Sequence, residues 1–152
     1  MAKQDLEELN QIAQFSALLA VALDSGLGMI PALDVTFSSA SGNVARQFQR
    51  LLTSLELGGN LFDELEKLRR KSPHSATSDL VIKLQVSMQF GSPLAEQLGR
   101  FAASLRSRIA QQQLTQAAKK ENLMLLPLVF LILPITVIFA IFPALQYLNI
   151  NY

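Results

Sequence analysis

Residues 123–145 read LMLLPLVFLILPITVIFAIFPAL, an apolar run without a charged side chain. As a helix these 23 residues would be about 34 Å long, enough to cross a bilayer hydrocarbon core roughly 30 Å thick. A helix of a soluble core would normally carry a polar face, whereas Thr136 is the only polar residue here. The run therefore predicts a transmembrane helix over residues 122–146, after a domain of residues 1–121 and before a tail of residues 147–152.

Basic residues lie before the apolar run and none lies after it. The five nearest are Arg100, Arg106, Arg108, Lys119 and Lys120. By the positive-inside rule, this asymmetry predicts a cytoplasmic N-terminal domain and a C-terminus on the other side of the membrane. We expect these side chains to contact lipid phosphates at the membrane surface or a partner protein. Because no aromatic residues alternate with them, we expect no nucleic-acid partner.

The composition of the 152-residue chain is typical of an all-α protein. Leu, Ala, Gln and Ser dominate before the apolar run, and β-branched residues are densest in the run itself. The first 121 residues are enough to bury one core. The chain has no cysteine, which excludes disulfides and thiolate metal sites.

Three segments of the N-terminal domain align with one another without gaps. They are residues 22–33, 54–65 and 87–98. Gly26, Gly58 and Gly91 coincide in this alignment, at spacings of 32 and 33 residues, which are typical of stacked helical hairpins. We expect each glycine to adopt a left-handed conformation at a hairpin turn. The three αα-hairpins are expected over residues of about 12–37, 43–71 and 78–118.

Apolar residues that recur every three or four positions predict six helices, which form a bundle of three αα-hairpins followed by the transmembrane helix. In chain order, the predicted faces are Ile12, Phe15, Leu19 and Leu23; Ile30, Leu33 and Phe37; Val44, Phe48, Leu51, Leu52 and Leu55; Leu61, Leu65 and Leu68; Leu80, Leu84 and Met88; and Leu94, Leu98, Phe101, Leu105 and Ile109. Breaks are predicted at residues 38–43 and 71–78, which are rich in Ser, Gly and Pro.

Residues at the expected helix starts predict caps of different strength. Asn60 is expected to cap the fourth helix, and Ser92 the sixth, with Pro93 at its first position. Gly28 offers the second helix a weaker cap. Because no helix breaker follows Pro93 until Pro127, the sixth helix is expected to run on as a stalk toward the membrane.

No group of residues predicts a catalytic, cofactor or metal site. His74 is the only histidine, so it lacks a second ligand of its kind and has no G-x-S-x-G serine to activate. Residues 57–60 are glycine-rich but lack the Lys and the Ser or Thr of a phosphate-binding loop. We expect Glu7 and Glu8 to favour the dipole of the first helix rather than act as acid and base.

The charged segment of residues 63–70 is interpreted as a solvated helix face. Two pairs with i,i+4 spacing are expected there, Asp63 with Lys67 and Glu66 with Arg70. A docking site for a partner is the alternative interpretation.

Within the apolar run, Pro134 cannot donate a hydrogen bond to the carbonyl of Phe130, which predicts a kink. Thr136, Ala140 and Ala144 are spaced by four and form a stripe of small residues. Such stripes allow close approach of helices in lipid, so we expect self-association or pairing with another membrane helix.

Several short motifs follow one another in a characteristic order. They are SG at 25–26, PAL at 31–33, LG at 57–58, FGSPLAEQL at 90–98, LRSR at 105–108, LPLVFLILP at 126–134 and FPAL at 142–145. Over residues of about 10–146 this pattern resembles the type II secretion system F domain, in the version found in Tad (tight adherence) pilus platform proteins.

The resemblance implies a six-helix cytoplasmic domain on a platform protein of the bacterial inner membrane, at the base of a type IV pilus or type II secretion machine. Such proteins have no catalytic residues and couple a cytoplasmic secretion ATPase to pilin assembly. The implied partners are this ATPase, pilins and a sister platform protein, in a homo- or hetero-oligomer. Family members usually carry further membrane helices before the domain, whereas Met1 opens directly on the first expected helix. This difference implies either a trimmed chain or a form of the protein with fewer membrane helices, in which a sister protein completes the platform.

Two other classes of function stay open at this point. A membrane-tethered helical scaffold or adaptor would present a concave groove with exposed apolar residues. A membrane enzyme or nucleotide-dependent sensor would bind nucleotide, for which no motif is present.

Overall fold

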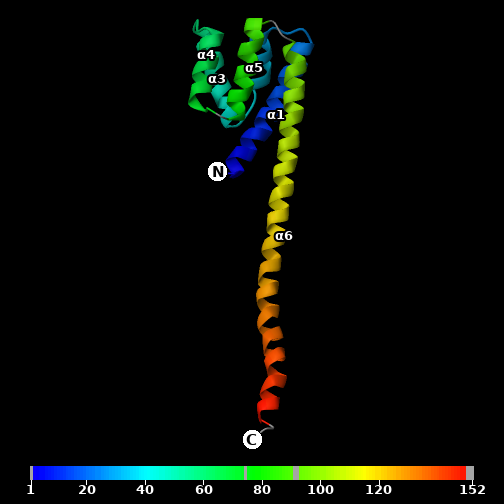
Figure 1. The fold of residues 1–152 in the computed structure, drawn as a ribbon. Helices are drawn as coiled ribbons and strands as arrows, with labels where there is room; N and C mark the ends of the chain where they lie inside the picture. Colours follow the sequence, from blue (N-terminus) through cyan, green and yellow to red (C-terminus); the bar gives the residue numbers. More distant parts are fainter. Residues whose placement is uncertain (1, 74, 91–92, 150–152) are drawn as a thin grey trace. The chain divides into compact units, whose positions relative to one another are not determined.

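The computed structural model describes the backbone of residues 2–73, 75–90 and 93–149, and the side chains of these residues except 2, 120–126, 128, 144, 148 and 149. Throughout these ranges the chain is all-α (Figure 1), as the composition predicted. The six helices are α1 (Ala2–Asp24), α2 (Met29–Phe37), α3 (Asn43–Glu56), α4 (Leu61–Lys71), α5 (Ala76–Phe90) and α6 (Leu94–Asn149). The two predicted breaks, residues 38–43 and 71–78, contain the connections between α2 and α3 and between α4 and α5, but α5 already begins at Ala76, inside the second predicted break.

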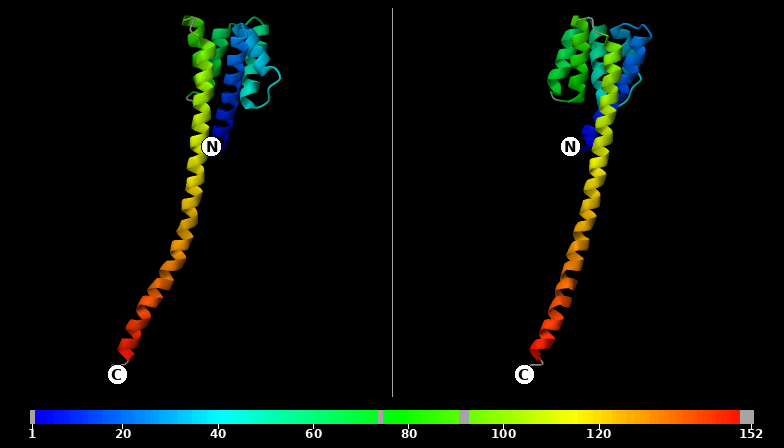
Figure 2. Two further views of the ribbon diagram at one scale, coloured as in Figure 1. Left: turned by 90° about the vertical axis from the view of Figure 1, so that its right-hand side faces the viewer. Right: turned by 45° about the vertical axis from the view of Figure 1, so that its right-hand side comes forward.

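The chain divides into two compact units, Met1–Ala110 and Gln111–Tyr152. In the first unit each of the helices α1 to α4 packs against the next one along the chain, and α5 packs back against α1. These contacts close the five helices into a ring instead of an open stack of hairpins. The first part of α6 lies side by side with α1 (Figure 2) and buries Leu98 and Leu105 against the ring.

Three phenylalanines from three helices meet in the core of the first unit. The ring of Phe37 on α2 lies 4.8 Å from that of Phe15 on α1 and 4.1 Å from that of Phe48 on α3, centroid to centroid. The rings of Phe37 and Phe48 are nearly parallel, at 3°. Burial of rings of this size dominates core energetics, so this stack holds α1, α2 and α3 together.

Aliphatic side chains from all six helices complete the core. Among those that are fully buried are Ile12, Leu19, Leu33, Leu65, Leu80, Leu84, Leu98 and Leu105. The sequence periodicity placed each of them on an apolar face. Two other predicted face residues, Ile30 and Met88, are exposed instead, and both lie in a terminal turn of their helix.

The turns that end α1 and α3 have the same backbone hydrogen bonds. After α1, Gly26 donates to the carbonyl of Leu23 and Leu27 to that of Ala22. After α3, Gly58 donates to Leu55 and Gly59 to Ser54. Gly26 has a φ of 94° and Gly58 a φ of 95°, the left-handed conformation that this Schellman motif requires. Gly91, aligned with them in the sequence, lies outside the described residues.

The starts of the next helices differ in their caps. The Oδ1 atom of Asn60 accepts hydrogen bonds from the backbone N–H groups of Phe62, at 2.9 Å, and Asp63, at 3.4 Å, as predicted. Gly28 at the start of α2 provides no side-chain cap. In α6 the carbonyl of Pro93 accepts from Gln97 at 3.3 Å, so Pro93 flanks the helix one position earlier than predicted, within the usual variation of helix ends.

The second unit consists of the remaining part of α6, and no helix break separates it from Leu94. Within its described residues, the segment Val129–Tyr147 is long and apolar enough to cross a membrane, and its side chains are unburied. Pro127, Pro134 and Pro143 all lie inside the helix. The axis curves along the part that carries the first two of them (Figure 2), and a kink centred on Pro134 stays a prediction.

Substitution of Gly42 tests whether the glycine-specific backbone conformations of the first unit contribute to its stability. Its φ of 116° and ψ of 177° lie in a region that is essentially restricted to glycine, and a Cβ atom there would lie 2.6 Å from Nε2 of Gln11. Gly42→Ala should therefore lower the free energy of unfolding by about 2–3 kcal/mol, and Gly58→Ala, which has open space around it, by about 1–2 kcal/mol. Chemical denaturation in mild detergent, followed by circular dichroism, measures both values.

Gly99→Ala is the matched control for these glycine substitutions. Gly99 lies inside α6 with no atom within 4 Å of its would-be Cβ, so alanine should stabilise the helix by up to about 1 kcal/mol. Equal effects at all three positions would contradict the conformational argument.

Candidate interaction surfaces

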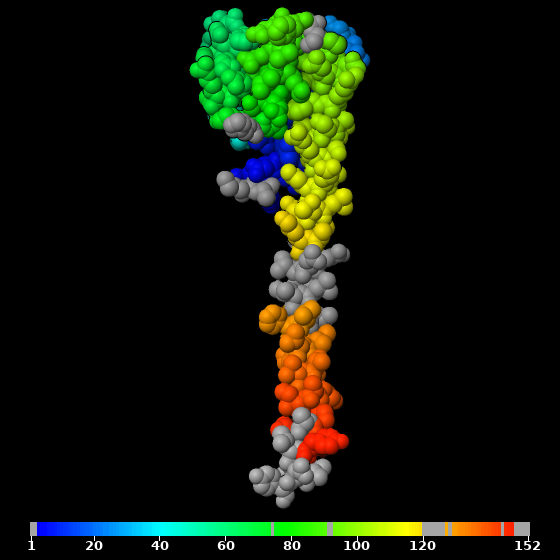
Figure 3. Space-filling model, viewed as in Figure 1, coloured from blue at the N-terminus to red at the C-terminus, as the bar shows by residue number. Residues whose placement is uncertain are grey.

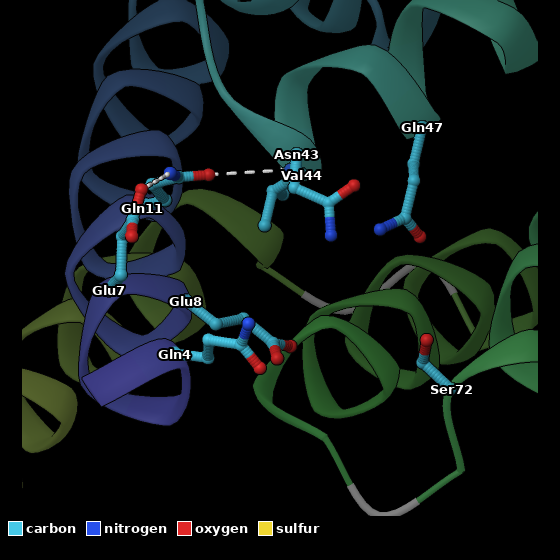
Figure 4. A pocket seen from close by; sticks show the side chains of 8 residues that line it. All are labelled: Gln4, Glu7, Glu8, Gln11, Asn43, Val44, Gln47 and Ser72. Carbon is cyan, nitrogen blue, oxygen red and sulfur yellow. Dashed lines mark hydrogen bonds between the residues drawn. The ribbon is translucent and has the colours of Figure 1, made fainter. Parts of the chain in front are cut away.

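A polar hollow of about 340 Å³ lies where the start of α1 faces α3 and the end of α4 (Figure 4). It is lined by Gln4, Glu7, Glu8, Gln11, Asn43, Val44, Gln47 and Ser72. Seven of these eight side chains are polar, so the hollow suits a hydrated or charged partner better than an apolar ligand.

Gln11 holds the start of α3 against α1 beside this hollow. Its Oε1 atom accepts a hydrogen bond from the backbone N–H of Val44 at 3.3 Å, and its Nε2 atom donates to Glu7 at 3.3 Å. Both bonds are drawn in Figure 4. The absence of a side chain at Gly42 leaves room for the amide of Gln11, which explains why glycine is needed there.

Glu8 has a structural role that the sequence analysis missed. Its Oε1 atom accepts hydrogen bonds from the backbone N–H of Thr77 at 3.1 Å and from the Thr77 hydroxyl at 2.7 Å. Glu8 thereby provides a carboxylate at the N-terminus of α5, where the helix dipole favours negative charge. The two residues are 69 positions apart, so no local pattern could have indicated this contact.

A second hollow, of about 390 Å³, lies between α3 and α4. It is lined by Asn43, Gln47, Arg50, Leu51, Glu64, Lys67, Leu68, Lys71 and Ser72. It shares Asn43, Gln47 and Ser72 with the first hollow, and it adds three basic side chains. None of the three hollows described in the first unit is a concave apolar groove of the kind expected for a helical scaffold, although exposed apolar residues are present.

The charged face of α4 is partly as predicted. Glu66 pairs with Arg70 at 3.0 Å, in the expected i,i+4 arrangement, and also with Arg69 at 2.7 Å. The expected pair of Asp63 with Lys67 is wrong, because Lys67 pairs with Glu64 at 2.6 Å. In the described structure Lys67 therefore forms its ion pair at i,i+3 spacing instead of the expected i,i+4 spacing, and both spacings place side chains on the same helix face.

Glu66 also links α4 to α5. The Nε2 atom of Gln85, a buried residue, donates to Glu66 at 3.3 Å. Hydrogen bonds from Arg69, then Arg70, then Gln85 lower the pKa of the Glu66 carboxyl from 4.5 to about 2. The hydrogen bond from Lys67 likewise lowers the pKa of Glu64.

The predicted membrane-surface residues are divided between the two units. Arg100, Arg106 and Arg108 are exposed on α6, and Arg100 forms an ion pair with Glu96. Lys119 is exposed in the second unit, and the side chain of Lys120 lies outside the described residues. Their contact with lipid or a partner stays a prediction.

The small-residue stripe lies in the second unit. The Thr136 hydroxyl donates to the carbonyl of Ile132 at 2.9 Å, so this polar group is satisfied within its own helix. Ala140 is exposed, and the side chain of Ala144 lies outside the described residues. Ile138, Phe139 and Phe142 line an apolar depression of about 190 Å³ on the same helix.

The described side chains form surface hollows and contacts at helix ends, which suit protein–protein contacts rather than catalysis. Within the described residues, no group of three or more His, Cys, Asp or Glu side chains is placed to hold a metal ion.

The family model for the type II secretion system protein F matches residues 15–142, which is most of the chain. The chain belongs to the type II secretion system F family. No curated protein and no solved structure shows significant similarity to it.

Membership in the F family means that the chain is not an enzyme, as the sequence predicted, because the platform proteins of this family are non-enzymatic. It is a component of a secretion or pilus platform, and its partners belong to that machinery. The family and the apolar segment Val129–Tyr147 together indicate the inner membrane. The match contains the helical repeats, the basic residues and nearly all of the apolar run.

The lowered pKa of Glu66 predicts a specific acid sensitivity. A carboxyl whose folded-state pKa is depressed stabilises the fold above its ordinary pKa, and this contribution is lost as the pH falls from 4.5 through about 2. Glu66→Gln should therefore lose less stability than the parent between pH 5 and pH 2, as measured by thermal unfolding at each pH.

Glu56→Gln is the control for this pH series. Glu56 is exposed, and it forms no ion pair within the described part of the chain. Its variant should follow the parent profile. Parallel profiles for Glu66→Gln and the parent would contradict the proposed role of the Glu66 cluster.

Proposed function

We propose that the chain is a platform component of a Tad or type IV pilus, or of a type II secretion machine, and that it couples a cytoplasmic secretion ATPase to pilin assembly. The observation that carries this proposal is the family match over residues 15–142, which includes the helical domain and most of the apolar run together. The order of the motifs, from SG at 25–26 to FPAL at 142–145, supports the Tad version in particular.

The proposed topology has three parts. Residues 1–121 form a cytoplasmic domain, residues 122–146 cross the membrane, and residues 147–152 lie outside. The support is the excess of Arg and Lys before the apolar run and its absence afterwards. The stripe of Thr136, Ala140 and Ala144 is proposed to pack against another membrane helix, of this chain or of a sister platform protein.

In the proposed mechanism, α6 transmits movement of the ATPase to the membrane segment. Two features support this role. The buried side chains of Leu98 and Leu105 anchor the first part of α6 to the ring, so this part cannot move independently of the domain. No helix break follows before Asn149, so the intervening residues have no built-in hinge other than the prolines after residue 126.

A flexible insertion tests this mechanism. A Gly-Ser linker inserted after Gln112 should abolish pilus assembly or secretion, because it interrupts α6 between the buried part and the apolar segment. The domain should keep its helicity and unfolding midpoint. A helix-preserving insertion of alanines of the same length is the matched control for the added residues, and normal assembly by the Gly-Ser variant would contradict the mechanism.

Cysteine labelling tests the topology, because the chain has no cysteine of its own. Single variants Lys71→Cys and Asn149→Cys should behave in opposite ways toward a membrane-impermeant maleimide applied from the periplasmic side. Asn149→Cys should react in intact spheroplasts, whereas Lys71→Cys should react only after lysis. Labelling of Lys71→Cys in intact spheroplasts would overturn the orientation.

A further inference from the structure

The hollow between α3 and α4 is lined by polar side chains from both helices. Asn43, Gln47 and Arg50 lie on α3 at spacings of four and three residues, so they share one helix face. Lys67 and Lys71 lie four residues apart on α4 and line the same hollow. Arginine and lysine side chains only donate hydrogen bonds, and the amide groups of Asn and Gln can also donate. The two helices therefore line one space with hydrogen-bond donors.

Most of these donors have no partner within the described chain. Arg50 and Lys71 are exposed, and neither forms an ion pair among the described residues. In the same part of the structure the side chains of Asn43, Gln47 and Ser72 take part in no hydrogen bond. Figure 4 shows Asn43 and Gln47 pointing from α3 into the space that Ser72 also faces. Because α4 lies at the surface of the first unit (Figure 3), a ligand can reach these groups from solvent.

The charge of this hollow favours an anion. Its lining carries three basic side chains and one acidic side chain, Glu64, which gives a net charge of +2. Glu64 already pairs with Lys67 at 2.6 Å, so the unpaired charges are those of Arg50 and Lys71. The described lining of the hollow beside α1 contains two glutamates and no basic residue. An anion is therefore attracted to the hollow between α3 and α4 rather than to its neighbour.

The set of donors indicates a phosphate-bearing ligand. A guanidinium group can bind two phosphate oxygens side by side, and a lysine ammonium group binds phosphate as a point charge. Arg50 and Lys71 reach the hollow from different helices, so two adjacent phosphate groups satisfy both cations better than a single carboxylate does. The volume of about 390 Å³ suits a small molecule. No aromatic residue is among the described lining residues, so the hollow offers no surface on which a base could stack.

We propose that the hollow between α3 and α4 binds a ligand with two adjacent phosphate groups. Arg50 and Lys71 bind one phosphate group each, and the side chains of Asn43, Gln47 and Ser72 donate hydrogen bonds to the phosphate oxygens. Asn43 is also the first residue of α3, where the helix dipole favours negative charge. The ligand is either a soluble diphosphate or a lipid whose headgroup carries two phosphates. This site goes beyond the proposed function, since it does not depend on which machine the chain serves.

Alkylation of a single cysteine tests the site on the full chain in lipid nanodiscs. The chain has no cysteine of its own, so Ser72→Cys places the only thiol in the hollow. In phosphatidylcholine discs, inorganic pyrophosphate should slow the reaction of this thiol with the neutral reagent iodoacetamide, because the bound anion covers it. In this background, Arg50→Gln with Lys71→Gln should raise the half-protecting concentration of pyrophosphate about tenfold or more, because two charge-assisted contacts are lost.

Exposed arginines outside the hollows provide the matched control. Arg46→Gln with Arg106→Gln removes the same number of positive charges at residues that line neither hollow, so the half-protecting concentration should stay that of the parent. Circular dichroism verifies the helicity of each variant. If the variant of Arg50 and Lys71 is not folded, the parent at about 0.5 M NaCl replaces it, where screening should raise the half-protecting concentration.

Discs that contain cardiolipin, whose headgroup carries two phosphates, identify the source of the ligand. Protection of the thiol in these discs without added pyrophosphate assigns the site to lipid. Protection that requires pyrophosphate in both kinds of disc assigns the site to a soluble diphosphate.

Three results would overturn the site. They are an equal half-protecting concentration in the parent and in the variant of Arg50 and Lys71, equal protection by sulfate and pyrophosphate, and no protection by either pyrophosphate or cardiolipin. The first two results would show that anions are attracted to the chain without a defined site for two phosphates. None of these readouts depends on pilus assembly or secretion, so the site can fail while the proposed function stands.

Discussion

The packing of α1 against α2, α3 and α5 is the constraint on which the first unit depends. Apolar contacts alone would allow α1 to slide or rotate, but two polar contacts fix its register. Gln11 holds the start of α3, and Glu8 holds the start of α5. These bonds act at helix N-termini, where backbone N–H groups would otherwise lack a partner. Because α5 returns to α1, the three-fold sequence repeat forms a closed ring with an internal core rather than an open solenoid.

The closed ring determines what kind of function the domain can have. Most of its large apolar side chains lie in the core, and the two hollows beside α3 are lined mainly by polar and charged residues. This surface suits contacts between proteins in water, where charge arrangement provides specificity more than affinity. A non-enzymatic platform component of the F family acts through such contacts and through its membrane helix, so the absence of a catalytic motif from the sequence is consistent with its role.

Local features of the fold could be predicted because each depends on a few neighbouring residues. The helix faces follow from apolar periodicity, the breaks from clusters of Ser, Gly and Pro, and the Asn60 cap from its position before an apolar residue. The Glu66–Arg70 pair followed from i,i+4 spacing, but the choice of Lys67 between Asp63 and Glu64 did not. Both acids lie within reach on one helix, and side-chain rotamers decide between them.

The sequence by itself determined the all-α class, the positions of the breaks, the apolar segment and the membership in the F family. Each of these features follows from amino-acid composition, apolar periodicity or the order of short motifs along the chain. Only the tertiary structure decided that Phe15, Phe37 and Phe48 meet, that Glu8 caps α5, and that the hollow beside α1 shares lining residues with the hollow between α3 and α4. The physical reason is distance along the chain. Contacts between residues tens of positions apart depend on how whole helices pack, and no local spacing records that packing.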